Sequence, residues 1–272
     1  MDDTYAYLTA DLKVNCPKCS GLCCVALYCR KMDGFPANKE AGKPCKHLLS
    51  DFRCAIYPEL ITKKMRGCLA YDCFGAGQKT TQYYFPDSDW KVMPKQRDEI
   101  FRTFAVVFQL HQMLWYLIQA FSLASDEHLK SAIEVLILEN EKMTHRPPQE
   151  ILQLDIEHRR LKVNKVLKQL INMITRHTSQ AIRNHDYSGQ DFNRGNLDGR
   201  DLSMTLMIAA NLEACSLKRT ILLGADMRGA NLKDTDLSES VFLTQMQINS
   251  AIGNSNTKIP VYLSRPNSWQ GV

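Results

Sequence analysis

Patterns typical of a secretory signal or a membrane span are what this sequence of 272 residues has little of. It begins MDDTYAYLTADLK, which is acidic and has no basic segment followed by an apolar run, so it does not read as a secretory signal. The longest apolar stretch, 104–124, is interrupted by Gln109, His111, Gln112 and Gln119, which a bilayer would penalise. We expect a cytoplasmic protein that does not enter a membrane.

Concentrated charge of either sign is also missing. The formal net charge is +5, and residues 187–272 hold eight basic and eight acidic side chains. A nucleic-acid binder carries clustered positive charge, and a protein that imitates DNA is strongly acidic. The sequence also contains no recognisable nucleophile–base motif and no H-x3-H pair, so it favours a non-enzymatic role without nucleic acid as partner.

Cysteine, in contrast, is abundant in one place. Nine of the ten cysteines lie between Cys16 and Cys73, in a segment too short to bury much apolar surface. Such a cluster is explained either by disulfides or by a metal. In a reducing compartment clustered cysteines are more often metal ligands, so we predict a metal site.

The spacing of these cysteines supports that prediction. A Cys-x-x-Cys turn lets two thiolates reach one ion, whereas the side chains of the adjacent Cys23 and Cys24 are expected to diverge and to serve two ions more easily. With Cys29 treated as a spare thiol, the predicted ligands are Cys16, Cys19, Cys23, Cys24, Cys45, Cys54, Cys68 and Cys73. Eight thiolates suffice for two closed zinc sites or for one four-cysteine iron–sulfur cluster with spares, and soft thiolates also accept copper(I). Zinc is the first choice.

The run C-x2-C-x3-C-C, followed by Cys45-Lys-His-Leu, Cys54-Ala-Ile-Tyr and Gly67-Cys68-x4-Cys73, resembles the YkgJ-type "zinc or iron chelating" cysteine-cluster domain. That resemblance covers about a fifth of the chain and implies metal binding, with the metal left open between zinc and iron.

Residues 95–183 show apolar positions at helical spacing. We predict one long helix to about Ser122, a second with Ser125 as its N-cap that stops before Arg146-Pro147-Pro148, and a third from near Pro148 to about Ile182. Short connections predict a small antiparallel bundle. His111 lies on the apolar stripe and is interpreted as a core histidine.

The segment between the cysteines and the helices contains two glycines and a short β-prone run. Gly75 and Gly77 are interpreted as turn residues that let the chain leave a metal knuckle, rather than as a backbone anion nest. We expect residues 80–85 to form a strand or a cover over the cluster.

The last third repeats every five residues. Central apolar residues recur from Tyr187 to Phe242, and from Gly195 onward the residue two before each is nearly always small, with Arg200 as the exception. Neither a helix nor a flat strand has this period, so a square coil with both positions inward is expected. The pattern resembles the pentapeptide-repeat family, best in 224–228 and 229–233. That resemblance covers about 185–245 and implies a right-handed quadrilateral β-helix with four repeats per coil.

The predicted fold class is therefore multi-domain α+β. A small Cys-rich metal-binding module occupies 1–90, a three-helix bundle 91–184, and a C-terminal right-handed quadrilateral β-helix of pentapeptide repeats 185–272. The register slips after Leu243, and the tail, which ends on Trp269, is expected to cap the coil or fold back along it. The whole arrangement resembles bacterial pentapeptide-repeat proteins.

One outward face of the predicted coil is apolar. Its members are Met204, Ile221, Leu223, Val241 and Leu243. Soluble proteins rarely leave such a strip bare, so we expect the bundle, a protein partner or a second copy in a homodimer to cover it, in preference to the C-terminal tail, which is needed as a cap.

Three functions stay open at this level. The favoured one is a metal-binding protein whose coil is a docking or assembly platform. The alternatives are a metalloenzyme or redox protein with an iron or iron–sulfur centre, and a topoisomerase-binding DNA mimic, against which the balanced charge argues.

Overall fold

The computed structural model describes residues 3–35, 37–175 and 185–270. The chain forms two compact units, one made of Met1–Met65 and Asp72–Lys168, the other of Arg66–Tyr71 and Gln169–Val272. The finer division at residues 90 and 184 stays a prediction.

The α-helices of the described residues differ widely in length. They are α1 (Ala6–Asp11), α2 (Leu22–Ala26), α3 (Arg66–Ala70), α4 (Ala76–Lys79), α5 (Pro94–Leu123), α6 (Glu127–Met143), α7 (Pro148–Ile151), α8 (Ile156–Thr175) and α9 (Gln245–Ser250). A π-helical segment, η5 (Thr80–Tyr84), continues α4, so the strand expected at residues 80–85 is wrong. Side chains Tyr83 and Tyr84 instead donate from η5 to the carbonyls of His145 and Thr144 at the end of α6.

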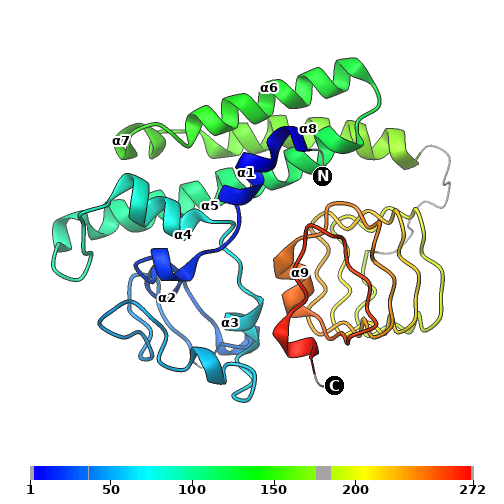
Figure 1. The fold of residues 1–272 in the computed structure, drawn as a ribbon, viewed down its shortest axis with the longest axis horizontal. Helices are drawn as coiled ribbons and strands as arrows, with labels where there is room; N and C mark the ends of the chain where they lie inside the picture. The colour runs from blue at the N-terminus through cyan, green and yellow to red at the C-terminus, as the bar shows by residue number, and fades with distance from the viewer. Residues whose placement is uncertain (1–2, 36, 176–184, 271–272) are drawn as a thin grey trace. The chain divides into compact units, whose positions relative to one another are not determined.

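In the first unit α5, α6 and α8 lie side by side, and the short α1 crosses them (Figure 1). The long predicted helix is confirmed as α5, whose buried face includes Phe104, Leu110 and Leu117. By length and composition α5 could span a membrane, but 67% of its apolar stretch is buried, as in a core helix.

A buried polar network ties the three helices together. The Arg159 guanidinium of α8 donates to Glu139 at 2.6 Å, to the Asn140 side chain at 3.2 Å and to the Leu136 carbonyl at 2.5 Å. Asn140 in turn donates to the Leu110 carbonyl of α5 at 2.7 Å. Because each buried polar group has a partner, this network fixes how the helices pair.

Two helix boundaries differ from the prediction. The N-cap of α6 is Asp126, whose carboxylate accepts from Leu129 N–H, rather than Ser125, since Asp126 stands three residues before that donor. The third helix is broken: α7 ends at Ile151, and Asp155 then accepts from His158 N–H at 2.9 Å at the start of α8. Its expected end at Ile182 lies outside the described residues.

In the second unit the backbone winds as stacked turns (Figure 1). Parallel bridges join residues twenty apart, from Asp186–Leu206 to Ile221–Val241, which confirms four repeats per coil. Within the described residues these are isolated bridges rather than extended strands, since each side of the square is too short for more.

The inward positions follow the predicted rule from Leu197 onward. The central residues and the small residues before them are almost fully buried, while Tyr187, Phe192 and Arg200 in the first coil are only half-buried. Hydroxyls at the small positions reach the previous coil: Thr220 donates to Leu197 O at 2.8 Å and Thr235 to Leu212 O at 2.7 Å.

The period of five also contains a backbone requirement. The residue two after each central position is left-handed throughout 189–234, with φ between 55° and 69°, and only some of these positions hold glycine. Aspartate or asparagine before the central residue accepts from the N–H two residues on, as Asp226 does from Arg228 at 3.2 Å. This side-chain turn supports the left-handed corner in residues that would otherwise avoid it.

The pattern is interrupted by α9 and then resumes. Ile252 pairs with Asn231 and Lys258 with Asp236, so bridge spacing grows by one and two residues. The C-terminal tail packs back on this region: the Trp269 ring lies against Gly253 and its Nε1–H donates to Ala251 O at 3.2 Å. In the same unit α3 packs against α9.

Candidate metal centre

The first cysteines are placed by a tight turn and a one-and-a-half-turn helix. Cys19 N–H donates to Cys16 O at 3.0 Å, and Gly21, at φ 70°, precedes α2. Leu22 and Val25 are fully buried and anchor α2. Cys23 and Cys24 lie between these two anchors, so the same short helix carries both thiols.

The Cys23 and Cys24 sulfurs lie 4.0 Å apart. The expectation that these adjacent side chains diverge is therefore wrong in this structure, because α2 and its surroundings bring both thiols to the same side. Thiolates that share one tetrahedral zinc stand about 3.8 Å apart, given zinc–sulfur bonds of about 2.3 Å. The pair could thus bind a common ion.

Two further sulfurs converge on Gly77 in α4. A Cβ at this position would lie 2.7 Å from Cys19 Sγ and 3.6 Å from Cys73 Sγ. Any larger residue would push the Cys19 thiol away, so glycine is required here by close approach rather than by a turn. The interpretation of Gly77 as a simple turn residue missed this cradle.

A second group of cysteines comes from the loops after α2. Cys45 N–H donates to Cys24 O at 2.9 Å, which places Cys45 beside the helix, and Leu48 pairs with Cys54 across a small hairpin. Cys29 pairs with Lys39 in the same way and is nearly buried.

Lysine ammonium groups hold these loops. Lys39 Nζ donates to four backbone carbonyls, those of Val25, Leu27, Glu40 and Lys43, at 2.5–3.3 Å. An ammonium with three protons surrounded by four acceptors acts as a local cross-link in a segment that has little apolar core. A second lysine, Lys91, donates to the carbonyls of residues 49 and 50.

The electrostatics of the metal-free thiols are uneven. Burial, with the neighbouring Asp72 and Cys19, raises the pKa of Cys73 to about 12. The pKa of Cys23 is raised because its thiol donates to Cys24, and the same hydrogen bond, with Lys39 nearby, lowers the pKa of Cys24 to about 7. Most thiols here would have to lose a proton to bind a metal, so binding should strengthen as pH rises.

Seven of the eight predicted ligands belong to the first unit. They are Cys16, Cys19, Cys23, Cys24, Cys45, Cys54 and Cys73. Cys68 lies on α3, in the second unit. All ten cysteines are among the described residues, and none of them forms a disulfide.

Proximity stops short of coordination. Over the part of the chain that the structure describes, no three or more His, Cys, Asp or Glu side chains are arranged to hold an ion. The donor chemistry suits a thiophilic metal: the Cys23 and Cys24 sulfurs lie 4.0 Å apart, and those of Cys19 and Cys73 both border Gly77. Asp72, adjacent to Cys73, is a carboxylate near the cluster that spacing did not single out; its Oδ1 accepts from Phe74 N–H at 2.7 Å.

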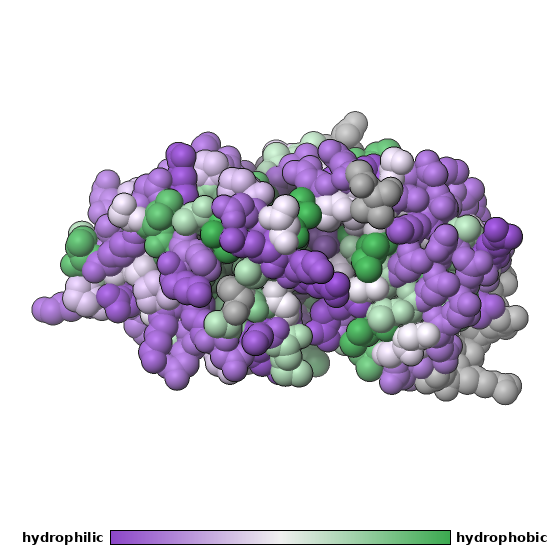
Figure 2. Space-filling model, turned by 90° about the horizontal axis from the view of Figure 1, so that it is seen from below, coloured by the Kyte–Doolittle hydropathy of each residue, from purple (hydrophilic) through white to green (hydrophobic). Residues whose placement is uncertain are grey.

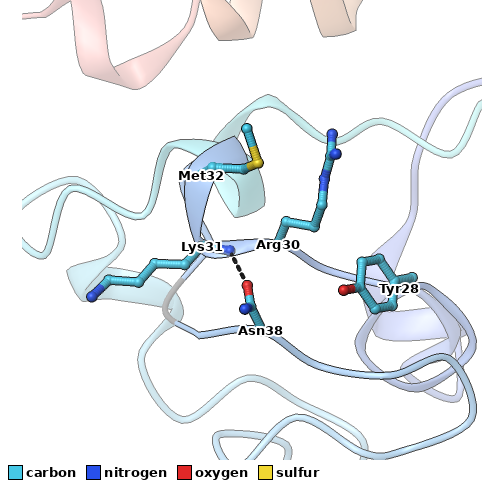
Figure 3. Close-up of a pocket in the computed structure, with 5 residues that line it drawn as sticks. All are labelled: Tyr28, Arg30, Lys31, Met32 and Asn38. Carbon is cyan, nitrogen blue, oxygen red and sulfur yellow. Dashed lines mark hydrogen bonds between the residues drawn. The ribbon is translucent and has the colours of Figure 1, made fainter.

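A shallow depression lies on the loop just after the first cysteines. Its lining consists of Tyr28, Arg30, Lys31, Met32 and Asn38, and Lys31 N–H donates to Asn38 Oδ1 at 2.8 Å (Figure 3). Arg30 is paired with Asp33 at 2.6 Å. The depression is a surface feature of this loop, and none of the predicted ligands lines it.

The apolar face of the coil is mostly covered. Ile221, Val241 and Leu243 are buried and Leu223 is half-buried, which leaves Met204, 71% exposed, as its open end. Most of the strip is therefore not left bare, as expected, and a protein partner or a second copy at its open end stays a prediction. On the face drawn in Figure 2, hydrophobic side chains form small groups among hydrophilic ones.

Two comparisons with known proteins bear on this chain. The family of pentapeptide repeats matches residues 207–242, with eight copies. The chain is also similar to the uncharacterized protein YybG of Bacillus subtilis (strain 168), with 39% identity over 266 residues, 96% of this chain and 95% of that protein.

Proposed function

The chain belongs to the same family as YybG, and we propose that it is a metal-binding protein whose cysteines hold a thiophilic ion, zinc first, while its pentapeptide coil serves as a rigid platform. The observation that carries the metal proposal is the convergence of thiols in the first unit. Cys19 and Cys73 meet at Gly77, and the Cys23 and Cys24 sulfurs are 4.0 Å apart. The likeness to the YkgJ-type domain supports the same conclusion.

Zinc is preferred over iron because a closed thiolate site needs no open coordination position and no redox partner. Iron has one observation in its favour. Seven predicted ligands in the first unit, beside Cys29, are more thiols than a single four-coordinate ion uses, so a four-cysteine iron–sulfur cluster with spare thiols is the second candidate.

The experiment that tests metal binding is the metal content of the full chain purified without oxygen. We expect about one or two zinc ions per chain, measured by mass spectrometry of the metals. A brown protein with iron and inorganic sulfide would replace zinc by the second candidate. A folded chain without any metal would refute the proposal.

Matched variants assign the ligands. Cys16→Ser and Cys73→Ser should each lower metal content. Gly77→Ala should do the same without removing a ligand, because its Cβ would displace the Cys19 thiol. Gly42→Ala is the control, since nothing lies within 4 Å of a Cβ there. The φ of Gly42 is 81°, whereas Gly77 is helical, so the control carries backbone strain without a clash.

The platform proposal concerns the open end of the apolar face. Met204 and Leu206 are 71% and 42% exposed, and a second copy is the simplest partner that they could contact. If they contact a second copy, sedimentation analysis should show a dimer that Met204→Asp with Leu206→Asp converts to a monomer. A monomeric parent chain would exclude the homodimer.

A further inference from the structure

The turn that follows Cys73 has an unusual backbone. Phe74 has φ 48° and Gly75 has φ 73°, so two successive residues are left-handed. Glycine adopts this conformation freely, but an aromatic residue does so at a cost of about 1–2 kcal/mol. Phe74 must therefore be held in place by its surroundings.

Contacts on every side of Phe74 hold this conformation. Its N–H donates to Asp72 Oδ1 at 2.7 Å, and its ring packs 5.9 Å from the rings of both Phe108 and Trp115 on α5. Its carbonyl lies 2.6 Å from Nδ1 of His111, also on α5. One long helix thus grips the side chain and the carbonyl of the residue after a predicted ligand.

The protonation of His111 follows from this geometry. A carbonyl can only accept, so Nδ1 carries the proton and donates. The side chain is 3% exposed, and an apolar residue in its place would leave the buried Phe74 carbonyl without this donor. Packing alone explains why a ring is buried at position 111. It does not explain why His111 Nδ1 donates to the carbonyl of Phe74, the residue that follows Cys73.

We propose that His111 is a positioning residue for the metal centre. By holding the Phe74 carbonyl it fixes the left-handed turn that directs the Cys73 thiol toward Gly77, where Cys19 also lies. The inference rests on the proposed metal binding and adds that α5, a helix with no cysteine of its own, sets the geometry of one ligand. Partners outside the ligand shell commonly affect metal affinity by 10- to 100-fold.

The test uses the full chain loaded with Co²⁺, whose thiolate charge-transfer absorption reports how many thiolates bind. His111→Ala should weaken Zn²⁺ binding by about 10- to 100-fold in competition with a chromophoric chelator. It should also reduce the charge-transfer intensity per bound cobalt by about one thiolate's share. His111→Asn, whose amide can donate to the same carbonyl, should restore much of both.

Leu117→Ala is the matched control, because Leu117 is a fully buried residue of the same helix. It should lower thermal stability and leave the cobalt spectrum and the zinc affinity unchanged. If His111→Ala behaves like this control, His111 only packs and the inference is wrong. If the parent chain binds neither metal, the proposed function itself fails. Should His111→Ala not fold, His111→Asn decides alone: a folded His111→Asn variant whose cobalt spectrum lacks one thiolate would also overturn the inference.

Discussion

The cysteine segment and the pentapeptide coil satisfy their backbones in opposite ways. In the coil, backbone N–H groups donate to carbonyls of the adjacent coil, about twenty residues away in the sequence. This pattern of backbone hydrogen bonds is repeated on every side of the square. Between Cys16 and Cys73 the helices are at most five residues long, and loop carbonyls are held by the ammonium groups of Lys39 and Lys91.

This difference separates two sources of stability. The coil has a continuous core in which leucines and small residues alternate, so its stability comes from apolar burial and hydroxyl bonds to the next coil. The cysteine segment has little core, so, on the proposed metal binding, we expect the free energy of binding to supply much of its stability. The two regions should therefore respond to different perturbations.

The largest expected effect is that of metal removal. A strong chelator should unfold the cysteine segment and leave the coil intact, because a structural thiolate site contributes on the order of 10 kcal/mol. Limited proteolysis should then cleave within residues 16–65 while a fragment from about 185 to 258 survives. Loss of both regions together, or of neither, would contradict the comparison.

The reverse perturbation acts on the coil. Leu212 is fully buried, and Leu212→Ala should lower the free energy of unfolding by about 2–5 kcal/mol. Chemical denaturation would measure this loss, and metal content should stay at the parent value. A drop in metal content with this variant would show that the two regions are not independent.

A pH effect of intermediate size is expected in the first unit. Burial, with smaller contributions from Lys79 and His145, lowers the pKa of His111 to about 4, compared with 6.5 for an ordinary histidine. The unfolded chain binds the proton more readily, so this stabilisation is present above pH 6.5 and is lost as pH falls toward 4. The loss should reach about 3 kcal/mol in denaturation of the reduced protein.

A matched variant isolates that effect. His111→Asn has no group that titrates between pH 4 and 6.5, so the difference in unfolding free energy between it and the parent should shrink by about the same amount over this window. A difference that does not change with pH would refute the assignment.

The smallest expected effect belongs to Cys29. It is nearly buried and lies outside the predicted ligand set, so Cys29→Ser should change metal content by nothing measurable, in contrast to Cys16→Ser. Equal losses from both variants, measured on the same preparation, would show that the ligand set has been assigned wrongly.

The coil could be predicted from the sequence because its determinants are local. Leu212 and Ala210 reveal their inward positions by spacing alone, and the twenty-residue bridges follow from four repeats per coil. The left-handed corners were less visible, since Arg194 or Ala209 occupies them as often as glycine does. There the aspartate or asparagine before the central residue is the signal, rather than glycine itself.

For the proposed metal centre, the sequence offers residue types but not geometry, and its ligand set stays a prediction. Spacing singled out Cys19 and Cys73, yet what brings their sulfurs together is the missing side chain of Gly77, from a helix that was expected to be a turn. Likewise, His111 read as a core residue because its partner, the Phe74 carbonyl, is 37 positions away in the sequence. Contacts of this kind depend on tertiary packing, which periodicity does not report.

The twenty-residue spacing of the bridges has a consequence for how such a chain can change length. Duplicating twenty residues would add one full coil of four repeats and leave every downstream side chain on its original side of the square. Duplicating five residues would rotate the rest of the chain by one side of the square. As a result, α9 and the strip ending at Leu243 would move to the neighbouring side. Relatives that keep both features should therefore differ in length within the repeats by whole coils of twenty residues.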